Sequence, residues 1–352
     1  MEHVENLILI FGSSLITFLL TLLLIPSFIK LLIKNKIIKN IRENSMDGKK
    51  STIFSAMHAN KSGTPTMGGV LIWGTVFLVV LCSLALPATG FTNNSLISRE
   101  ETYLPLFTLL VTAILGAVDD LFNIRGVGKV KGIAARPKII WLTIFAFLGS
   151  LWFYYNLEWK TRGIHIPRLG DFIIGFWYIP LFIFVIIGTA NAVNITDGLD
   201  GLAGGLLIIA YGVFGALSYA KGLYILSTFC GVVCGSTLAF LWFNLPPAKF
   251  YMGDTGSLSL GATLGVIAMM TNSVAVLPIV CFVFVLETLS VILQIFSKKI
   301  RGKKIFAVAP IHHHFEYLGW PEHLVTMRFW IIGGIFGTVG LIVGLIGMGD
   351  LP

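Results

Sequence analysis

Long hydrophobic runs separated by short polar segments dominate this chain of 352 residues. A helix needs about 20 predominantly apolar residues to cross the hydrocarbon core of a bilayer. We find no internal repeat that would divide the chain. The pattern predicts an all-α, polytopic integral membrane protein that forms a single domain over residues 1–352. About ten transmembrane helices are expected, at 7–33, 68–88, 103–121, 138–156, 172–190, 201–219, 223–243, 257–271, 275–297 and 328–348, of which 257–271 is short.

The amino-acid composition excludes an ordinary soluble domain. Hydrophobic residues make up 56% of the chain and charged residues only 12%, whereas a soluble domain carries about 25% charged residues. The net charge of +8 has a simple source, because cytoplasmic loops of membrane proteins are rich in lysine and arginine. Attraction to anionic lipid adds to this. The charge therefore predicts membrane lipid as a partner and no nucleic acid.

The basic residues are divided unequally between the two sets of loops. Segment 30–61 holds eight, 122–138 five and 298–328 six, and Lys249 brings this set to 20 of the 25 lysines and arginines. The positive-inside rule assigns the larger set to the cytoplasm. With ten spans, both termini are then predicted to be periplasmic. The predicted cytoplasmic active-site loops are approximately 34–67, 121–138, 191–200, 244–257 and 298–328.

Ionisable side chains recur at the ends of the apolar runs. Such a group near hydrocarbon costs several kcal/mol unless it is paired or hydrated, so we expect these groups to have a function. Separate loops bring them to one membrane face. All except Glu287 fall on the predicted cytoplasmic side: Asp119, Asp120, Asp197, Asp200, Asp254, Glu316, His312, His313 and His314.

The segment Lys61-Ser-Gly-Thr-Pro-Thr66-Met-Gly-Gly69 precedes the second hydrophobic run. Its glycine and proline content predicts a tight loop, and backbone N–H groups at a following helix start can hold an anion. Lys61 would add a point charge for a phosphate. The alternative is an ordinary loop with a cytoplasmic lysine.

Asp119 and Asp120 close the third run. Consecutive residues on a helix point about 100° apart, so the two carboxylates cannot act as one bidentate ligand. One is expected to reach a metal or an acceptor while a lysine holds the other. A basic loop after an acidic pair suits a polyphosphate neutralised by magnesium and lysine; a solvated helix end is the alternative. The basic residues are Lys129, Lys131, Arg136 and Lys138.

Four polar residues, Asn191, Asn194, Asp197 and Asp200, follow one another at intervals of three. This spacing places side chains on one helical face. Amide and carboxylate oxygens aligned in this way can bind Mg²⁺ or the hydroxyls of a sugar. Asp197 or Asp200 alone could instead cap a helix.

The segment from Asn244 to Ser257 places Asp254 between glycines at a predicted helix start. Asp254 is a candidate ligand of a hard cation, and the ring of Tyr251 offers a face on which a base can stack. A simple N-cap role for Asp254 is the competing interpretation.

The last polar block holds His312, His313, His314 and Glu316. Zinc binding through imidazole and Glu316 and phosphate binding through imidazole both remain open. Glu287 lies well inside a hydrophobic run, where a carboxylate is a functional hypothesis by default. A neutral, hydrogen-bonded glutamic acid that orients the helix is equally compatible with the sequence. The residues by themselves predict a cytoplasm-facing cleft for Mg²⁺ and a phosphorylated ligand.

Five blocks together, KSGTPTMGG, AVDD, NAVNITDGLDGL, NLPPAKFYMGDTGSL and PIHHHFE, resemble those of the phospho-N-acetylmuramoyl-pentapeptide-transferases. These enzymes are part of the polyprenyl-phosphate N-acetylhexosamine-1-phosphate transferase superfamily. The resemblance extends from about Lys30 to the last hydrophobic run. It implies a Mg²⁺-dependent enzyme that transfers phospho-MurNAc-pentapeptide from UDP-MurNAc-pentapeptide to undecaprenyl phosphate, giving lipid I and UMP. It also implies a homodimer in the bacterial cytoplasmic (inner) membrane, with the active site facing the cytoplasm.

The resemblance also implies roles for individual residues. Asp254, with Asp197, matches the magnesium site, and Asp119 matches a base toward the lipid phosphate, with Asp120 beside it. His312, His313 and His314 match a catalytic histidine cluster. One departure is Tyr251, where the family usually has phenylalanine. The substrate-binding positions are Lys61, Thr66, Lys129, Lys131 and Lys138 around the phosphates, and Asn191, Asn194, Asp197, Asp200, Asn244 and Tyr251 around the nucleotide.

Two other functions are alternatives to this one. A transferase that loads GlcNAc-1-phosphate onto a polyprenyl phosphate would share the aspartate blocks, but the TPTMGG and HHHFE forms argue against it. A secondary transporter would place charges near the midplane of inverted repeats, whereas only Glu287 lies there. For the transfer itself, direct attack by the lipid phosphate is favoured over a covalent intermediate on Asp119.

Overall fold

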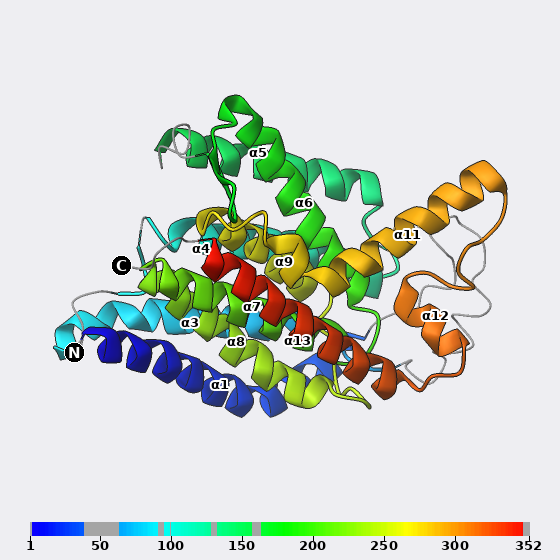
Figure 1. The fold of residues 1–352 in the computed structure, drawn as a ribbon. Helices are drawn as coiled ribbons and strands as arrows, with labels where there is room; N and C mark the ends of the chain where they lie inside the picture. Colours follow the sequence, from blue (N-terminus) through cyan, green and yellow to red (C-terminus); the bar gives the residue numbers. More distant parts are fainter. Residues whose placement is uncertain are drawn as a thin grey trace.

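The fold was analysed in a computed structural model that describes residues 2–38, 63–90, 95–98, 100–127, 132–156 and 163–347. It is a bundle of helices with one small hairpin (Figure 1). The helices are α1 (Glu2–Lys34), α3 (Gly69–Cys82), η2 (Ser83–Thr89), α4 (Tyr103–Ile124), α5 (Ala135–Asn156), η3 (Gly175–Trp177), α6 (Tyr178–Thr196), α7 (Leu202–Ala220), α8 (Tyr224–Asn244), α9 (Asp254–Met270), α10 (Leu277–Val280), α11 (Phe282–Arg301), α12 (Ile311–Tyr317) and α13 (Glu322–Ile346).

Helix α9 is the centre of the bundle. Every residue from Thr255 to Met269 is buried, and α4 and α6 pack along it more extensively than its other neighbours. Glycines permit the close approach: a Cβ on Gly116 of α4 would lie 2.2 Å from the carbonyl oxygen of Asp254. Small residues at helix contacts are typical of membrane bundles. The sequence of α9 is therefore suited to a buried position inside the bundle, where its N-terminus is held by neighbouring helices.

Eight helices in the part of the chain that the structure describes are long and apolar enough to cross a membrane. They overlap eight of the ten predicted runs, and the polytopic helical fold is thereby confirmed. The run at 257–271 lies in α9, which has only 17 residues. The run at 275–297 is divided between α10 and α11 at Cys281.

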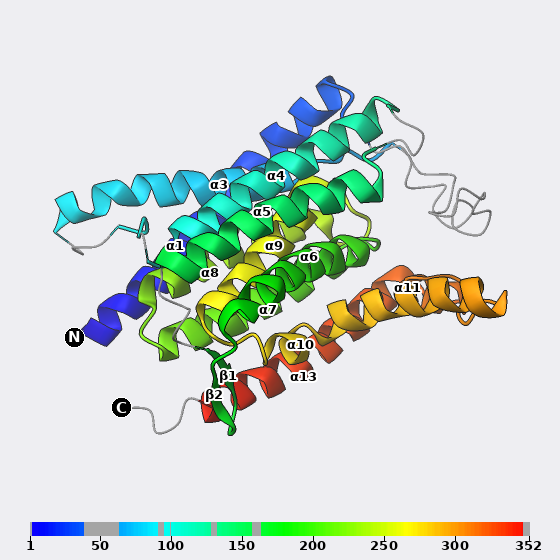
Figure 2. The same ribbon diagram turned by 90° about the horizontal axis from the view of Figure 1, so that it is seen from above.

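Helix α11 differs from the others because its two faces have different chemistry. Its buried residues include Glu287, Ser290, Gln294 and Ser297, whereas Leu289, Ile292, Leu293 and Phe296 are exposed. In Figures 1 and 2 α11 projects beyond the neighbouring helices at the end of the bundle where α12 lies. A polar face toward the protein and an apolar face outward suit a helix that borders lipid.

The prediction of an all-α fold needs one small correction. Residues Ile164–Ile166 (β1) and Gly170–Phe172 (β2) form an antiparallel hairpin with Ile164 opposite Phe172. It was missed because it lies in a short polar segment between two predicted spans. The hairpin is joined to the end of α13 by His165 Nε2, 2.6 Å from the carbonyl oxygen of Gly347.

The start of α1 and the end of α13 lie at the same end of the bundle as the hairpin, and α12 lies at the opposite end (Figures 1 and 2). The ends of α4 and α6 and the starts of α5 and α9 all meet at the end near α12, which is where the predicted site residues gather.

Candidate active site

The side chain of Asp120 fastens the start of α9 to the end of α4. Asp120 Oδ1 accepts a hydrogen bond from the backbone N–H of Asp254 (3.0 Å), and Oδ2 accepts one from Thr255 (3.0 Å). The first N–H groups of a helix have no partner within that helix, and a carboxylate there also interacts favourably with the helix dipole. Asp120 therefore caps α9 from another helix and fixes the position of Asp254.

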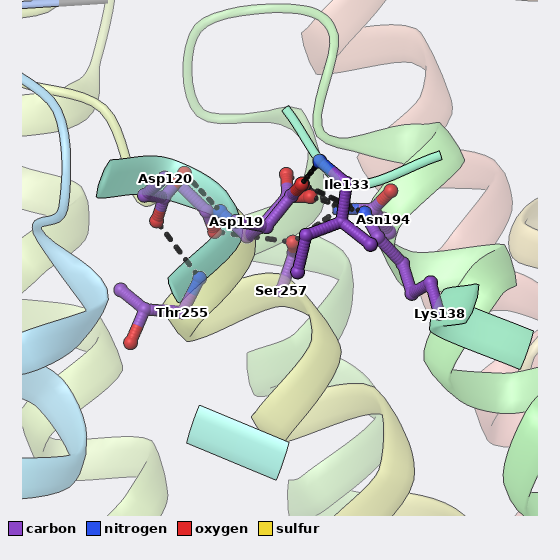
Figure 3. A network of polar contacts seen from close by, with 9 residues as sticks. Asp119, Asp120, Ile133, Lys138, Asn194, Thr255 and Ser257 are labelled. Atoms are coloured by element: carbon purple, nitrogen blue, oxygen red, sulfur yellow. Dashed lines mark hydrogen bonds and ion pairs between the residues drawn. The ribbon is translucent and has the colours of Figure 1, made fainter. Parts of the chain in front are cut away.

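The neighbouring Asp119 points away from Asp120 and toward Lys138 (Figure 3). Lys138 Nζ lies 2.8 Å from Asp119 Oδ2 and 2.7 Å from Asp254 Oδ2, so one ammonium group joins two carboxylates. The expected divergence of the two aspartates, one of them held by a lysine, is confirmed, but the other, Asp120, caps α9 with both oxygens where a contact to a metal or an acceptor was expected. The exposed fractions of the side chains are 1% for Asp119, 11% for Lys138 and 23% for Asp254. The cluster is thus most open at Asp254.

The remaining oxygens of this cluster also have partners. Asn194 Nδ2, on α6, lies 3.0 Å from Asp254 Oδ1 and 2.9 Å from Ser257 Oγ. The backbone N–H of Ile133 donates to Asp119 Oδ1. Ser257 was not singled out from the sequence, although it lies three residues after Asp254 and so shares its helix face. We call Asp119, Lys138, Asn194, Asp254 and Ser257 the carboxylate cluster.

The carboxylate cluster fits a magnesium ion. Mg²⁺ prefers oxygen ligands and is usually bound through one or two carboxylates, with substrate phosphates and water completing its shell. Two carboxylates against one ammonium leave a formal charge of −1, which attracts a cation. Asp254 is the most exposed acid of the cluster. Within the described ranges no three His, Cys, Asp or Glu side chains converge on one point, so an ion completed by phosphate fits better than a cage made of protein alone.

Backbone hydrogen bonds join the segment before α3 to the segment before α9. Tyr251 N–H donates to the carbonyl of Pro65, and Gly68 N–H donates to the carbonyl of Tyr251, both at 2.8 Å. Gly69 N–H donates to the carbonyl of Met252 at the same distance. Thr66, which is 2% exposed, lies within this pairing. The first and fourth polar blocks of the sequence are therefore one structural unit beside the cluster.

The third block does not form one continuous helical face. Helix α6 ends at Thr196, and Asp197 follows as its C-cap residue. Asn194 reaches the carboxylate cluster, but the amide of Asn191 donates to the carbonyl of Ile187 in its own helix. The spacing of three was therefore informative only as far as the helix continues, because the glycine-rich turn that follows redirects the chain.

Asp200 and Asn244 make contacts that hold loops in place. Asp200 Oδ2 accepts a hydrogen bond from the N–H of Ala248 (2.9 Å), and Asp200 N–H donates to Glu322 Oε1 (2.7 Å). Asn244 Oδ1 accepts from the N–H of Gly201 (3.0 Å), and its amide donates to the carbonyl of Phe250 (2.9 Å). Glu322 was not predicted, since its partner is 122 residues away. These side chains support the loops that carry Asp197 and Tyr251.

On α12 the rings of His312 and His313 lie side by side, with centroids 4.1 Å apart, and the Nε2 atoms of both face Gly198 in the turn after α6. His312 Nδ1 lies 2.9 Å from Glu287 Oε2, and both side chains are completely buried. His313 Nδ1 lies 2.6 Å from Glu316 Oε2, and the ring of His314 meets the edge of Phe306. The structure gives Glu287 a hydrogen-bond partner, His312, which both interpretations of this residue allow. Among the described residues no three His, Cys, Asp or Glu side chains are grouped so as to hold a metal ion, so the zinc alternative has no geometric support.

Three predicted phosphate-binding residues, Lys61, Lys129 and Lys131, lie outside the described residues. The predicted site residues that the structure describes gather at the end of the bundle near α12. The carboxylate cluster brings together Asp119, Asn194, Asp254 and Lys138, while Asp197 and Tyr251 belong to the adjoining turn and loop. The site therefore combines hard oxygen ligands, one ammonium group and an aromatic ring.

Comparison with known proteins agrees with this chemistry. Residues 103–272 match the family model described as glycosyl transferase family 4. Residues 61–72 match phospho-N-acetylmuramoyl-pentapeptide-transferase signature 1. These two matches include the aspartates of the cluster and the loop before α3.

Several curated proteins named phospho-N-acetylmuramoyl-pentapeptide-transferase are similar over almost their whole length. One from a Geobacillus species is 39% identical over 332 residues, which is 94% of this chain and 96% of the relative. One from Chloroflexus aggregans is 40% identical, over 94% of this chain and 88% of the relative. One from Staphylococcus carnosus is 38% identical, over 96% of this chain and all of the relative. Identity at this level across the whole bundle shows that the chain belongs to the phospho-N-acetylmuramoyl-pentapeptide-transferase family.

Proposed function

We propose that this protein transfers phospho-MurNAc-pentapeptide from UDP-MurNAc-pentapeptide to undecaprenyl phosphate, producing lipid I and UMP. The observation that carries the proposal is the carboxylate cluster, in which Lys138 joins Asp119 to Asp254 at the start of the buried helix α9. Its acidic and basic groups suit a reaction between a nucleotide-linked pyrophosphate and a lipid phosphate. Family membership supplies the identity of the two substrates.

In the transfer, an oxygen of the lipid phosphate attacks the β-phosphorus of the UDP-sugar. A new pyrophosphate bond forms, and the bond from the β-phosphorus to the bridging oxygen breaks, so that UMP leaves with that oxygen. Asp119 accepts the last proton of the lipid phosphate. A bound Mg²⁺, held by Asp254 with Asp197, would neutralise phosphate charge during this step. Lys138 adds positive field around the phosphates, and the imidazoles of α12 are proposed to contact them.

Direct attack is favoured because the lipid phosphate is already a good nucleophile. Asp119 also has both oxygens engaged, by Lys138 and by the N–H of Ile133, which suits a base held in place better than a freely moving nucleophile. Rapid quenching of enzyme mixed with UDP-MurNAc-pentapeptide in the absence of lipid tests this. Release of UMP equal to the amount of enzyme would indicate a covalent intermediate instead.

The nucleotide is proposed to lie against the loop before α9. Tyr251 is half-buried there, and its phenol ring can stack on uracil. Asn244 is committed to Gly201 and Phe250, so its proposed contribution to uridine binding is mainly to hold this loop. Asn191, Thr66, Asp200 and the lysines at 61, 129 and 131 complete the proposed substrate-binding set.

The proposed setting is the bacterial cytoplasmic membrane, with the site facing the cytoplasm. The excess of lysine and arginine in the loops at that end supports this orientation. Ten crossings are proposed, with α9 and α11 added to the eight helices that are long and apolar enough to cross a membrane. Both termini then face the periplasm, in keeping with the shared position of the start of α1 and the end of α13 (Figure 2). Assembly as a homodimer is part of the same proposal.

The experiment that tests the activity uses purified full-length protein in detergent with undecaprenyl phosphate and Mg²⁺. We expect lipid I and UMP in equal amounts from UDP-MurNAc-pentapeptide, and no lipid product after magnesium is chelated. UDP-GlcNAc serves as the competing donor. Turnover of UDP-GlcNAc alone would identify the GlcNAc-1-phosphate transferase instead.

A further inference from the structure

The pair formed by Glu287 and His312 is the most deeply buried contact between ionisable groups in the described chain. Both side chains have an exposed fraction of 0%. Burial of an ionisable pair is costly unless its geometry is good. Glu287 stands on α11 and His312 on α12, and the distance from Nδ1 to Oε2 is 2.9 Å. The pair is separate from the carboxylate cluster, so it needs its own explanation.

The other ring nitrogen of His312 faces the turn after α6. A Cβ added to Gly198 would overlap His312 Nε2 and would lie 3.3 Å from His313 Nε2, so His312 Nε2 is close against the backbone that follows Asp197, with His313 Nε2 beside it. Nε2 is buried and has no hydrogen-bond partner among the described residues. A buried polar atom without a partner costs about 1–3 kcal/mol. The ring is therefore held with Nδ1 hydrogen-bonded to Glu287, while Nε2 faces the turn that follows Asp197.

The segment between α11 and α12 is attached to α11 by contacts that do not involve Glu287. Gln294 Oε1 accepts hydrogen bonds from the N–H groups of Ile305 (2.9 Å) and Phe306 (3.0 Å), and its amide donates to the carbonyl of Phe306 (2.7 Å). Ser297 Oγ donates to the carbonyl of Lys303 (2.8 Å). Because these contacts already hold this segment against α11, the contact between Glu287 and His312 is not needed for that attachment.

We propose that Glu287 is a positioning residue of the transferase. By accepting a hydrogen bond from Nδ1–H, it fixes the orientation of the His312 ring and its protonated nitrogen, and presents Nε2 to the turn at Asp197 and Gly198. A carboxylate that sets a histidine tautomer in this way is a recurring device in enzymes and metal sites. This inference rests on the proposed function, which makes that turn part of the site for the donor pyrophosphate.

Two substitutions of Glu287 separate positioning from packing. Glu287→Gln keeps an oxygen that accepts from Nδ1–H, whereas Glu287→Leu removes the acceptor and keeps an apolar side chain of similar size. We expect Glu287→Leu to lower kcat on the order of 100-fold, as for other carboxylates that orient a histidine. KM for the lipid acceptor should change less than threefold. Glu287→Gln should retain at least ten times the kcat of Glu287→Leu.

Matched controls come from the same buried face. The Ser290 hydroxyl donates only to the carbonyl of Glu287 in its own helix, so Ser290→Ala should leave kcat within twofold of wild type. Gly198→Ala should lower kcat as strongly as Glu287→Leu, because the added methyl group occupies the position that Nε2 faces. Thermal unfolding of each variant in the same detergent identifies any that fail to fold.

Nitrogen-15 spectra of histidine-labelled protein provide a readout that packing alone would not move. Comparison with His312→Asn assigns the His312 signals. We expect Nδ1 to carry a proton in wild type and in Glu287→Gln, and the Nδ1 signal to change in Glu287→Leu. Wild-type protein with the proton only on Nε2, or a folded Glu287→Leu with kcat within twofold of wild type, would overturn the inference. Wild-type protein that makes no lipid I would instead contradict the proposed function.

Discussion

Two of the places where the described residues bury a carboxylate beside a basic side chain differ in how open they are. In the carboxylate cluster, one lysine serves two aspartates, and the side chain of Asp254 is 23% exposed. Between α11 and α12, one glutamate faces one histidine and neither is exposed. A shared, partly open arrangement can exchange partners with a substrate or ion, whereas a closed pair can only hold a ring in place. The carboxylate cluster is thus suited to binding, and the contact between Glu287 and His312 is suited to positioning.

The largest effect is expected for Asp254→Asn. An amide keeps the shape of the side chain and can still accept from Asn194, but it loses the negative charge that suits it to a magnesium ion. We expect lipid I formation to fall about 10³-fold, with a thermal midpoint near that of wild type. Initial rates over a range of Mg²⁺ concentrations provide the measurement. Activity within tenfold of wild type would remove Asp254 from its assigned role.

The next effect is expected for Lys138→Met, which leaves Asp119 and Asp254 side by side without a cation. Removing one member of a buried ion pair costs about 3–5 kcal/mol, and the partial exposure of Asp254 favours the lower end. Activity should fall about 100-fold. Mg²⁺ should raise the thermal midpoint of this variant more than that of wild type, because an ion that binds only the folded state stabilises it. Equal midpoint shifts in the two proteins would contradict a shared role for lysine and metal.

A smaller effect, and of a different kind, is expected for Asp120→Asn. The amide can accept only one of the two hydrogen bonds that Asp120 receives from α9. Loss of one hydrogen bond to a charged group corresponds to about 1.5–3 kcal/mol. We expect a lower free energy of unfolding and about tenfold less activity, with no change in the Mg²⁺ concentration that gives half-maximal rate. A changed Mg²⁺ requirement would mean that Asp120 is itself a ligand.

The smallest effect is expected for Tyr251→Phe, which removes only the phenol hydroxyl. Both rings present an aromatic face of the same size, so kcat and KM for the nucleotide substrate should stay within twofold. Steady-state kinetics with UDP-MurNAc-pentapeptide measure this. A larger change would show that the phenol hydroxyl has a role of its own.

Much of this fold was predictable because a helix that crosses a membrane requires a long apolar run, which is visible in the sequence. The runs at 257–271 and 275–297 were less typical for physical reasons that the structure makes clear. Helix α9 has only 17 residues and is enclosed by other helices, and α11 turns a polar face inward. The hairpin at 164–172 has too few residues on each strand to produce a recognisable alternation.

For the site, the sequence indicated the correct end of the molecule but not the division of tasks. Asp119 and Asp120 are adjacent, yet one meets a lysine and the other the start of a helix 134 residues away. Glu287 stayed unexplained because its partner, His312, comes from another helix. A motif shows which residue types are present, whereas partners that are distant in the chain are set by how the helices pack.

The position of Lys138 between two aspartates has a consequence for the resting protein. Two buried acids without a counter-charge would repel each other and strain the start of α9, so a protein that relied on a tightly held ion would be weakened whenever that ion departed. Lys138 supplies this counter-charge from within the chain, 2.8 Å from Asp119 and 2.7 Å from Asp254. The start of α9 is therefore not left with two uncompensated acids when no ion is bound.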